Sequence, residues 1–285
     1  MIEWHDYLNG ENPEKHTVTG KLRVWKDAFS PQLNNQRDIF VYLPPSYGQA
    51  GKRFPVIYMQ DGQNLFDRAT SFVDEWQVDE TMETLAQTEG LEAIVVGIPN
   101  IAERRVHEYS PFAARMGGGQ ADSYLRFVID TLKPVIDADF LTQKSRKTTG
   151  IVGSSLGGLL STYAFFHRPD VFGFMGALSP AYWFAGQAIM PYLRRMPYID
   201  GKIYLDVGTA EMGSSRGSSF FRQNAHEVYE LLLQKGYRSG VDLHYIEENQ
   251  AAHNEAAWAR RLPDAMRFLL GDGREYADSL RKHVI

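Results

Sequence analysis

The segment TTGIVGSSLGGLLSTYAFFHRP, residues 148–169, decides the fold. It begins with a short apolar run, turns through Gly153-Ser154-Ser155-Leu156-Gly157, and continues with residues that suit a helix. A Gly-x-Ser-x-Gly pattern between a strand and a helix is typical of a sharp turn that holds the serine hydroxyl above a parallel sheet. The glycines are needed because side chains there would strike the neighbouring strand and helix. Ser155 is therefore the predicted nucleophile.

A second match to the same pattern lies at residues 213–217, Gly-Ser-Ser-Arg-Gly. No apolar strand precedes it, and polar residues follow it in place of a small-residue helix. We interpret it as a polar loop near the mouth of the site, so Ser215 is the alternative that Ser155 must be tested against.

The rest of the chain alternates between predicted strands and helices. The strands are expected at 17–28, 37–43, 54–60, 92–98, 148–153, 172–178, 202–207 and 241–246. The helices are expected near 75–88, 121–138, 157–167, 185–196, 222–235 and 255–270. This order predicts an α/β protein with a mostly parallel sheet of about eight strands and helices on both faces. No linker divides residues 1–285, so we expect a single domain, and residues 183–202 leave no room for a large lid.

The composition excludes several kinds of active site and disfavours several kinds of partner. The chain of 285 residues has no cysteine, which excludes thiol nucleophiles, disulfides and Cys-ligated metal sites. Its net charge of −5 does not favour a nucleic-acid or membrane partner, and we expect a small-molecule substrate. No HExxH or EF-hand spacing occurs, so neither a metal nor another cofactor is expected. The first residues lack a signal-peptide pattern, which favours a cytoplasmic location. The sequence does not indicate an oligomeric state.

His253 is the predicted general base. Five histidines follow Ser155. His167 ends the helix expected at 157–167, and those at positions 226, 244 and 283 fall in a helical stretch, in a strand and in the charged tail. His253 lies in the loop between the last predicted strand and the last helix, where Asn254 can cap that helix. The chain order of nucleophile, acid and histidine in this type of fold also favours His253.

Two carboxylates compete for the role of the acid that orients the base. Glu211 follows the strand at 202–207 through Gly208-Thr209-Ala210 and would lie at the carboxyl edge of the sheet. Asp206 lies within the strand itself and fits a buried hydrogen-bonding carboxylate as well. We favour Glu211 and keep Asp206 as the alternative.

Acyl transfer also requires backbone N–H groups that stabilise the oxyanion. In this type of fold one comes from the residue after the nucleophile, here Leu156. The other is expected from the turn Asp61-Gly62-Gln63-Asn64 after the third strand, with Gln63 as the preferred donor. A plain Asp-Gly turn is the alternative interpretation.

Several ordered motifs together resemble the "Putative esterase" family of α/β-hydrolases. They are VYLPPSY at 41–47, PVIYMQDGQNLF at 55–66, the Gly153–Gly158 turn, LSP at 178–180, GTAE at 208–211 and HNE at 253–255. The family includes enterochelin and other siderophore esterases, feruloyl and acetylxylan esterases, S-formylglutathione hydrolases and mycolyltransferases. The resemblance implies Ser155 as nucleophile, His253 as base and Glu211 as acid, with Gln63 and Leu156 in the oxyanion hole.

The expected activity is hydrolysis of a carboxylic ester through an acyl-enzyme. Siderophore trilactones, feruloyl or acetyl sugar esters and simple short-chain esters all fit, and acyl transfer or a non-catalytic binding role are the alternatives. Candidates for an apolar wall of the site are the aromatic residues near predicted strand ends, Phe66, Trp76, Tyr182 and Trp183. They fit core positions as well, and for Trp76 we favour the core. The pair Arg104-Arg105 is a candidate clamp for an anionic substrate, although Glu103 and Glu108 offer these arginines partners in a solvated loop.

Overall fold

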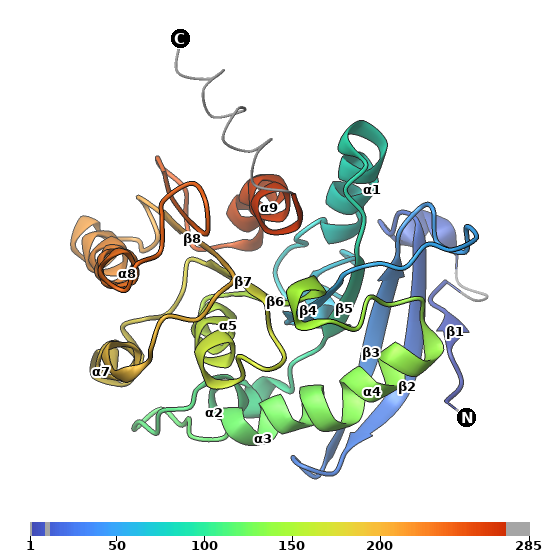
Figure 1. The fold of residues 1–285 in the computed structure, drawn as a ribbon. Helices are drawn as coiled ribbons and strands as arrows, with labels where there is room; N and C mark the ends of the chain where they lie inside the picture. Colours follow the sequence, from blue (N-terminus) through green and yellow to red (C-terminus); the bar gives the residue numbers. More distant parts are fainter. Residues whose placement is uncertain (1, 9–11, 272–285) are drawn as a thin grey trace.

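The computed structural model describes residues 2–8 and 12–271, and their strands form one nine-stranded sheet (Figure 1). The spatial order is β1-β2-β3-β5-β4-β6-β7-β8-β9. The strands are β1 (His5–Asp6), β2 (Lys21–Ser30), β3 (Asn35–Leu43), β4 (Val56–Gln60), β5 (Ile94–Ile98), β6 (Thr149–Ser154), β7 (Phe174–Leu178), β8 (Lys202–Gly208) and β9 (Leu243–Glu248).

The sheet is antiparallel at one edge and parallel elsewhere. β1, β2 and β3 pair antiparallel, and β3 pairs antiparallel with β5. All pairings from β5 through β4 and β6 to β9 are parallel. The eight predicted strands correspond to β2 to β9. The two-residue β1 was not predicted, because so short a strand has no periodicity of its own.

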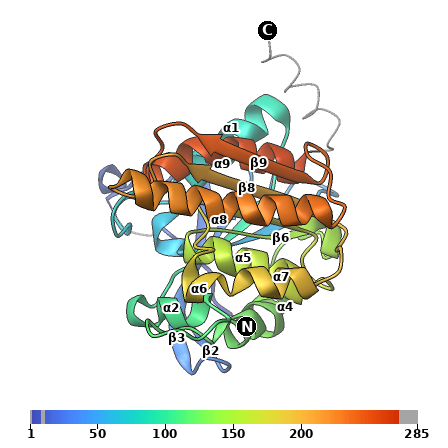
Figure 2. The same ribbon diagram turned by 90° about the vertical axis from the view of Figure 1, so that its left-hand side faces the viewer.

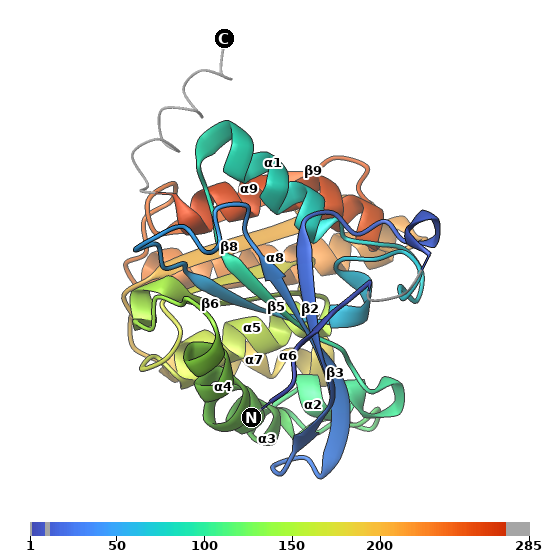
Figure 3. The same ribbon diagram turned by 90° about the vertical axis from the view of Figure 1, so that its right-hand side faces the viewer.

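Helices cover both faces of the sheet (Figures 1 and 3). α1 and α9 contact each other on one face, while α5 packs on β6 and β7 from the other and α8 lies along β8 (Figure 2). The helices are α1 (Val78–Glu89), α2 (Arg105–Tyr109), α3 (Ala121–Arg126), η4 (Phe127–Leu132, a π-helix), α4 (Lys133–Asp139), α5 (Leu156–His167), α6 (Phe184–Gln187), α7 (Ile189–Arg195), α8 (Ser215–Gln234) and α9 (Glu255–Leu270).

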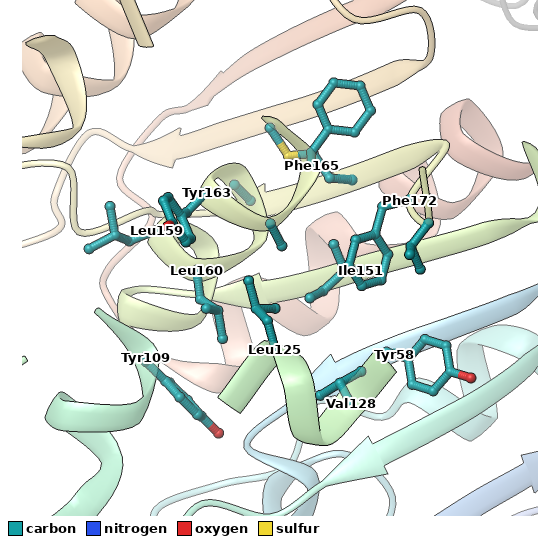
Figure 4. Packing of buried hydrophobic residues seen from close by; sticks show 14 of the residues in the cluster. Tyr58, Tyr109, Leu125, Val128, Ile151, Leu159, Leu160, Tyr163, Phe165 and Phe172 are labelled. Carbon is teal, nitrogen blue, oxygen red and sulfur yellow. The ribbon is translucent and has the colours of Figure 1, made fainter. Parts of the chain in front are cut away.

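Two hydrophobic cores result from the alternation of side chains along the strands. In β4, Val56 and Tyr58 join the core beneath α5, whereas Ile57 and Met59 join the core beneath α1 and α9. Figure 4 shows part of the first core, where Ile151 of β6 lies beside the ring of Phe172 and Leu160 of α5 belongs to the same cluster. Strands buried on both faces explain the continuous apolar runs in the sequence.

Helix boundaries differ from the prediction at two places. α8 begins at Ser215, well before the predicted residue 222, because the Ser214 Oγ accepts a hydrogen bond from Gly217 N and caps the helix. The predicted polar loop at 213–217 is therefore largely a helix start. Residues 184–195 form two short helices, α6 and α7, in place of one. In the part of the chain that the structure describes, no helix combines the length and apolarity required to span a membrane.

Candidate active site

Ser155 occupies the sharp turn between β6 and α5. Its backbone has φ 54° and ψ −120°, a region that costs a non-glycine residue conformational energy. The neighbouring strand fixes this conformation: Ser155 N donates to the Leu178 carbonyl at 3.0 Å, and Ala181 N donates to the Ser155 carbonyl at 2.9 Å. The glycine requirement is strict at Gly153, where a Cβ atom would lie 2.8 Å from the Gly157 backbone as well as 2.1 Å from the Gln60 side chain.

His253 and Glu211 form a hydrogen-bonded pair. His253 Nδ1 lies 2.5 Å from Glu211 Oε2, and the Glu211 side chain is fully buried. The ring of His253 is held between Phe221 and Trp258, whose centroids lie 5.0 and 5.1 Å away. The position of His253 also depends on the start of α9, where Asn254 Oδ1 accepts from Ala257 N at 3.0 Å, as the sequence predicted.

Ser179 connects this pair to the interior of the protein. Its Oγ accepts hydrogen bonds from Trp258 Nε1 at 3.1 Å and from Arg261 Nη2 at 2.8 Å. Both of these nitrogens are donors only, so the hydroxyl proton of Ser179 must point to Glu211 Oε1, 2.6 Å away. Glu211 Oε1 also accepts from Gly208 N at 2.5 Å. The carboxylate is therefore oriented by donors on one oxygen and by His253 on the other.

The two candidate acids have opposite electrostatic environments. Burial alone would raise the pKa of Glu211, but hydrogen bonds from His253 and Ser179 hold that pKa below its ordinary value. Burial raises the pKa of Asp206 to about 6, although the charge of Arg261 acts to lower it. Arg261 Nε lies 3.0 Å from Asp206 Oδ2. The other oxygen of Asp206 accepts from Ser179 N at 3.1 Å. Asp206 thus joins the end of β8 to Ser179 and Arg261, and Glu211 is the carboxylate in contact with His253.

The turn after β4 is rigidly held. Asp61 has φ 56°, and its carboxylate is gripped by Arg105 through two hydrogen bonds of 2.8 Å and by Asn100 Nδ2 at 2.6 Å. Gln63 Oε1 accepts from Asn100 N at 3.1 Å, which ties the next residue of the turn to the loop after β5. Asn64 Nδ2 donates to Glu255 Oε1 at 3.2 Å, so the turn is also joined to the start of α9 beside His253.

Gln63 lies in the 3₁₀-helix η2 (Gly62–Asn64) and Leu156 is the first residue of α5, and backbone N–H groups in the first turn of a helix have no intrahelical acceptor. Within residues 2–8 and 12–271, neither N–H donates a backbone hydrogen bond outside those helices. Both N–H groups therefore remain candidates for the oxyanion hole.

An open cleft of about 780 Å³ brings these elements together. Ser155, His253 and Gln63 all line it, with aromatic walls from Trp76 and Trp258. Phe72 stands at its rim with 88% of its surface exposed. A volume of this size suits a small organic molecule or one segment of a larger one.

Two predicted substrate contacts lie elsewhere. Among the described residues that line the cleft, Arg104 and Trp183 do not occur, and Ser215 is also absent. Arg104 is exposed on the short helix before α2, while its neighbour Arg105 turns inward to Asp61 and reaches the cleft. The ring centroids of Trp183 and Phe221 lie 6.1 Å apart, so Trp183 contacts the His253 ring only indirectly, through Phe221. The adjacent arginines could not be distinguished in sequence because a short helix, not a strand, sets their directions.

The sequence did not indicate roles for Ser179 or Arg261. Ser179 stood in the LSP motif, directly after a strand, and the strand-end rule that selected the other residues would have selected it too. Arg261 lies on α9 and gave no signal, because only the packing of α9 against the sheet brings it to Asp206.

Known proteins resemble this chain in sequence and in fold. A family model described as "Putative esterase" matches residues 30–269. The chain belongs to this family. It is 27% identical over 259 residues to the uncharacterized protein YbbA of Bacillus subtilis, covering 87% of this chain and 98% of that protein. It is also 27% identical to the ferri-bacillibactin esterase BesA of B. subtilis, covering 82% of this chain and 86% of BesA.

Among solved structures, the BES protein from Bacillus cereus superposes with a TM-score of 0.71 at 21% identity, over 88% of this chain and 95% of the other. This likeness establishes the α/β-hydrolase fold for the esterase. Membership of the family makes the chain an ester hydrolase.

Proposed function

We propose that the esterase is a serine carboxylesterase that works through an acyl-enzyme, with Ser155 as nucleophile, His253 as general base and Glu211 as the orienting acid. The observation that carries this proposal is the Glu211–His253 hydrogen bond of 2.5 Å, because His253 lines the same cleft as a serine on a strained turn. These are the groups that activate a hydroxyl nucleophile in acyl transfer.

In the first half-reaction, Ser155 Oγ attacks the carbonyl carbon and its proton passes to His253 Nε2. The carbonyl oxygen becomes an oxyanion that accepts hydrogen bonds from Gln63 N and Leu156 N. The ester C–O bond then breaks, and the leaving alkoxide takes the proton from His253. Water attacks the acyl-enzyme by the same sequence of steps, which releases the acid and restores Ser155. The ionised Glu211 stabilises the positive charge of His253 in both halves.

Ser155→Ala tests the proposal. We expect this variant to lose essentially all turnover of p-nitrophenyl acetate while its thermal unfolding is unchanged, and a fluorophosphonate probe should label only proteins that retain Ser155. Ser215→Ala is the matched control, because Ser215 lies on α8 outside the cleft lining. Undiminished turnover in Ser155→Ala, or loss in Ser215→Ala alone, would refute the assignment.

For the substrate, we propose a carboxylic ester with a bulky acyl part, and a siderophore lactone as the second candidate. The wide cleft with the exposed Phe72 at its rim supports the first. The second is supported by the similarity to BesA, named as a ferri-bacillibactin esterase, and by Arg105 in the cleft wall. Comparing kcat/KM for an acyl-chain series, a ferulate ester and a catecholate trilactone separates these classes. Product analysis with an added alcohol separates hydrolysis from acyl transfer.

A further inference from the structure

A group of three carboxylates lies at the start of α1, outside the active site. Glu75, Asp79 and Glu80 each place one oxygen within 4.8 Å of the oxygens of the other two. Glu75 is 5% exposed and Asp79 is fully buried. Charged carboxylates so deep in a protein are costly unless a partner compensates them.

Hydrogen bonding satisfies only part of this group. Thr17 Oγ1 donates to Glu75 Oε2 at 2.7 Å, and Thr19 N donates to Asp79 Oδ2 at 2.6 Å. The other oxygens, Glu75 Oε1 and Asp79 Oδ1, are buried and accept from no donor among the described residues. Glu80 Oε2 is also buried and accepts from none of them. Burial and a hydrogen bond with Glu80 raise the pKa of Asp79 to about 9, so these two carboxyl groups share a proton when no cation is bound. A cation that binds the cluster displaces this proton, and Glu75 Oε1 has no such partner among the described residues.

The surrounding charges do not compensate the group. The charged neighbours that act most strongly on Glu75 are Glu80, Asp67 and Asp74, all of them acidic. Asp67 already has its own partner, since His16 Nδ1 lies 2.6 Å from Asp67 Oδ2. The three carboxyl groups thus form an oxygen-only pocket whose strongest charged neighbours are acidic.

We propose that Glu75, Asp79 and Glu80 bind one hard divalent cation, with Ca²⁺ as the expected ion. Carboxylate oxygens are the ligands that Ca²⁺ and Mg²⁺ prefer, and no nitrogen or sulfur ligand belongs to this cluster. Two oxygens on a single Ca²⁺ lie at most about 5 Å apart, which agrees with the spacing within the cluster. Ca²⁺ accepts irregular coordination more readily than Mg²⁺ does. No established metal-binding motif runs through these residues, which is why their sequence did not indicate a site.

The cation would fasten one wall of the cleft to the rest of the protein. Trp76 lies between the ligands in sequence, lines the cleft and packs on Trp258 with ring centroids 5.4 Å apart. Thr17 and Thr19, which hold the outer oxygens, precede β2. The ion would therefore hold the segment before β2 and the start of α1 together, and it takes no part in bond breaking.

The full chain, stripped of metal with EDTA and exchanged into metal-free buffer, provides the test. We expect about 1 mM Ca²⁺ to raise the midpoint of thermal unfolding by about 5 °C and titration calorimetry to give one site per chain. Mg²⁺ is expected to give a smaller shift. Ser155→Ala should give the same shift, so the result does not depend on the proposed catalytic role.

Glu75→Gln and Glu80→Gln should each remove most of the Ca²⁺ response. The amide of Glu75→Gln keeps an acceptor oxygen for Thr17, so this variant is expected to fold. Glu83→Gln is the matched control: it makes the same charge change on α1, but the Glu83 carboxylate accepts from Tyr42 OH at 3.0 Å and belongs to no cluster. It should keep the wild-type response. Absence of both a thermal shift and binding heat in the wild type overturns the proposal, as does an undiminished response in both cluster variants.

Discussion

The substitution Glu211→Gln tests how the hydrogen-bond network sets the chemistry of His253. Ser179 Oγ and Gly208 N both donate to Glu211 Oε1, and the proton of Ser179 cannot point elsewhere because Trp258 and Arg261 occupy its lone pairs. In the variant, the amide oxygen must therefore take the Oε1 position. The NH₂ group is then forced toward His253 Nδ1.

This orientation gives His253 the wrong tautomer. With Nδ1 accepting from the amide, the proton of the neutral ring must sit on Nε2, which then cannot accept the proton of Ser155. Loss of the carboxylate also removes the charge that stabilises the imidazolium. Comparable changes in serine hydrolase triads lower kcat by about 10⁴-fold, or about 5 kcal/mol of transition-state stabilisation. We expect a decrease of about 10³- to 10⁴-fold in kcat, with KM changed by less than about threefold.

The assay is steady-state turnover of p-nitrophenyl acetate, with circular dichroism to verify the fold. Glu247→Gln is the control, because Glu247 is exposed on β9 and pairs with Arg222 on the surface. It should retain wild-type kinetics. If Glu211→Gln keeps kcat within about threefold of the wild type, the reasoning fails, and Asp206→Asn becomes the variant to measure.

Three further predictions concern the surroundings of the site. Ser179→Ala leaves Trp258 Nε1 without its acceptor, so we expect the free energy of unfolding measured in urea to fall by about 3 kcal/mol. We also expect kcat to fall about tenfold, and an unchanged kcat would mean that Ser179 has a structural role only. Gly62→Ala would place a Cβ atom 2.6 Å from the β5 backbone and so displace the turn that holds Gln63. Turnover and the free energy of unfolding should both fall. Gly213→Ala is the control and should match the wild type, because Gly213 has open space around it. Burial lowers the pKa of His244 to about 4, below its unfolded value, so its stabilising contribution is present at neutral pH and is lost as the pH falls. In His244→Phe, the loss of unfolding free energy between neutral pH and pH 5 should be about 2 kcal/mol smaller, and an equal loss in both proteins would contradict this.

The sequence by itself determined the sheet and the positions of the reacting groups. All eight long strands were predictable because strands buried on both faces read as short apolar runs. The parallel order places each strand end at one edge, so Ser155, Glu211 and His253 could be chosen as residues that follow strands. Single-domain organisation, a cytoplasmic location and the catalytic roles of these residues remain predictions.

Only the tertiary structure decided how the groups are oriented and which neighbours hold them. Sequence left Glu211 and Asp206 as alternatives, and packing of α9 on β8 separated them by giving Arg261 to Asp206 and His253 to Glu211. The tertiary structure also directs Arg105 inward to Asp61 and leaves Arg104 exposed to solvent. These contacts join residues far apart in the chain, and their geometry depends on helix rotation and burial, which local sequence patterns do not encode. The oxygens of Glu75, Asp79 and Glu80 converge for the same reason.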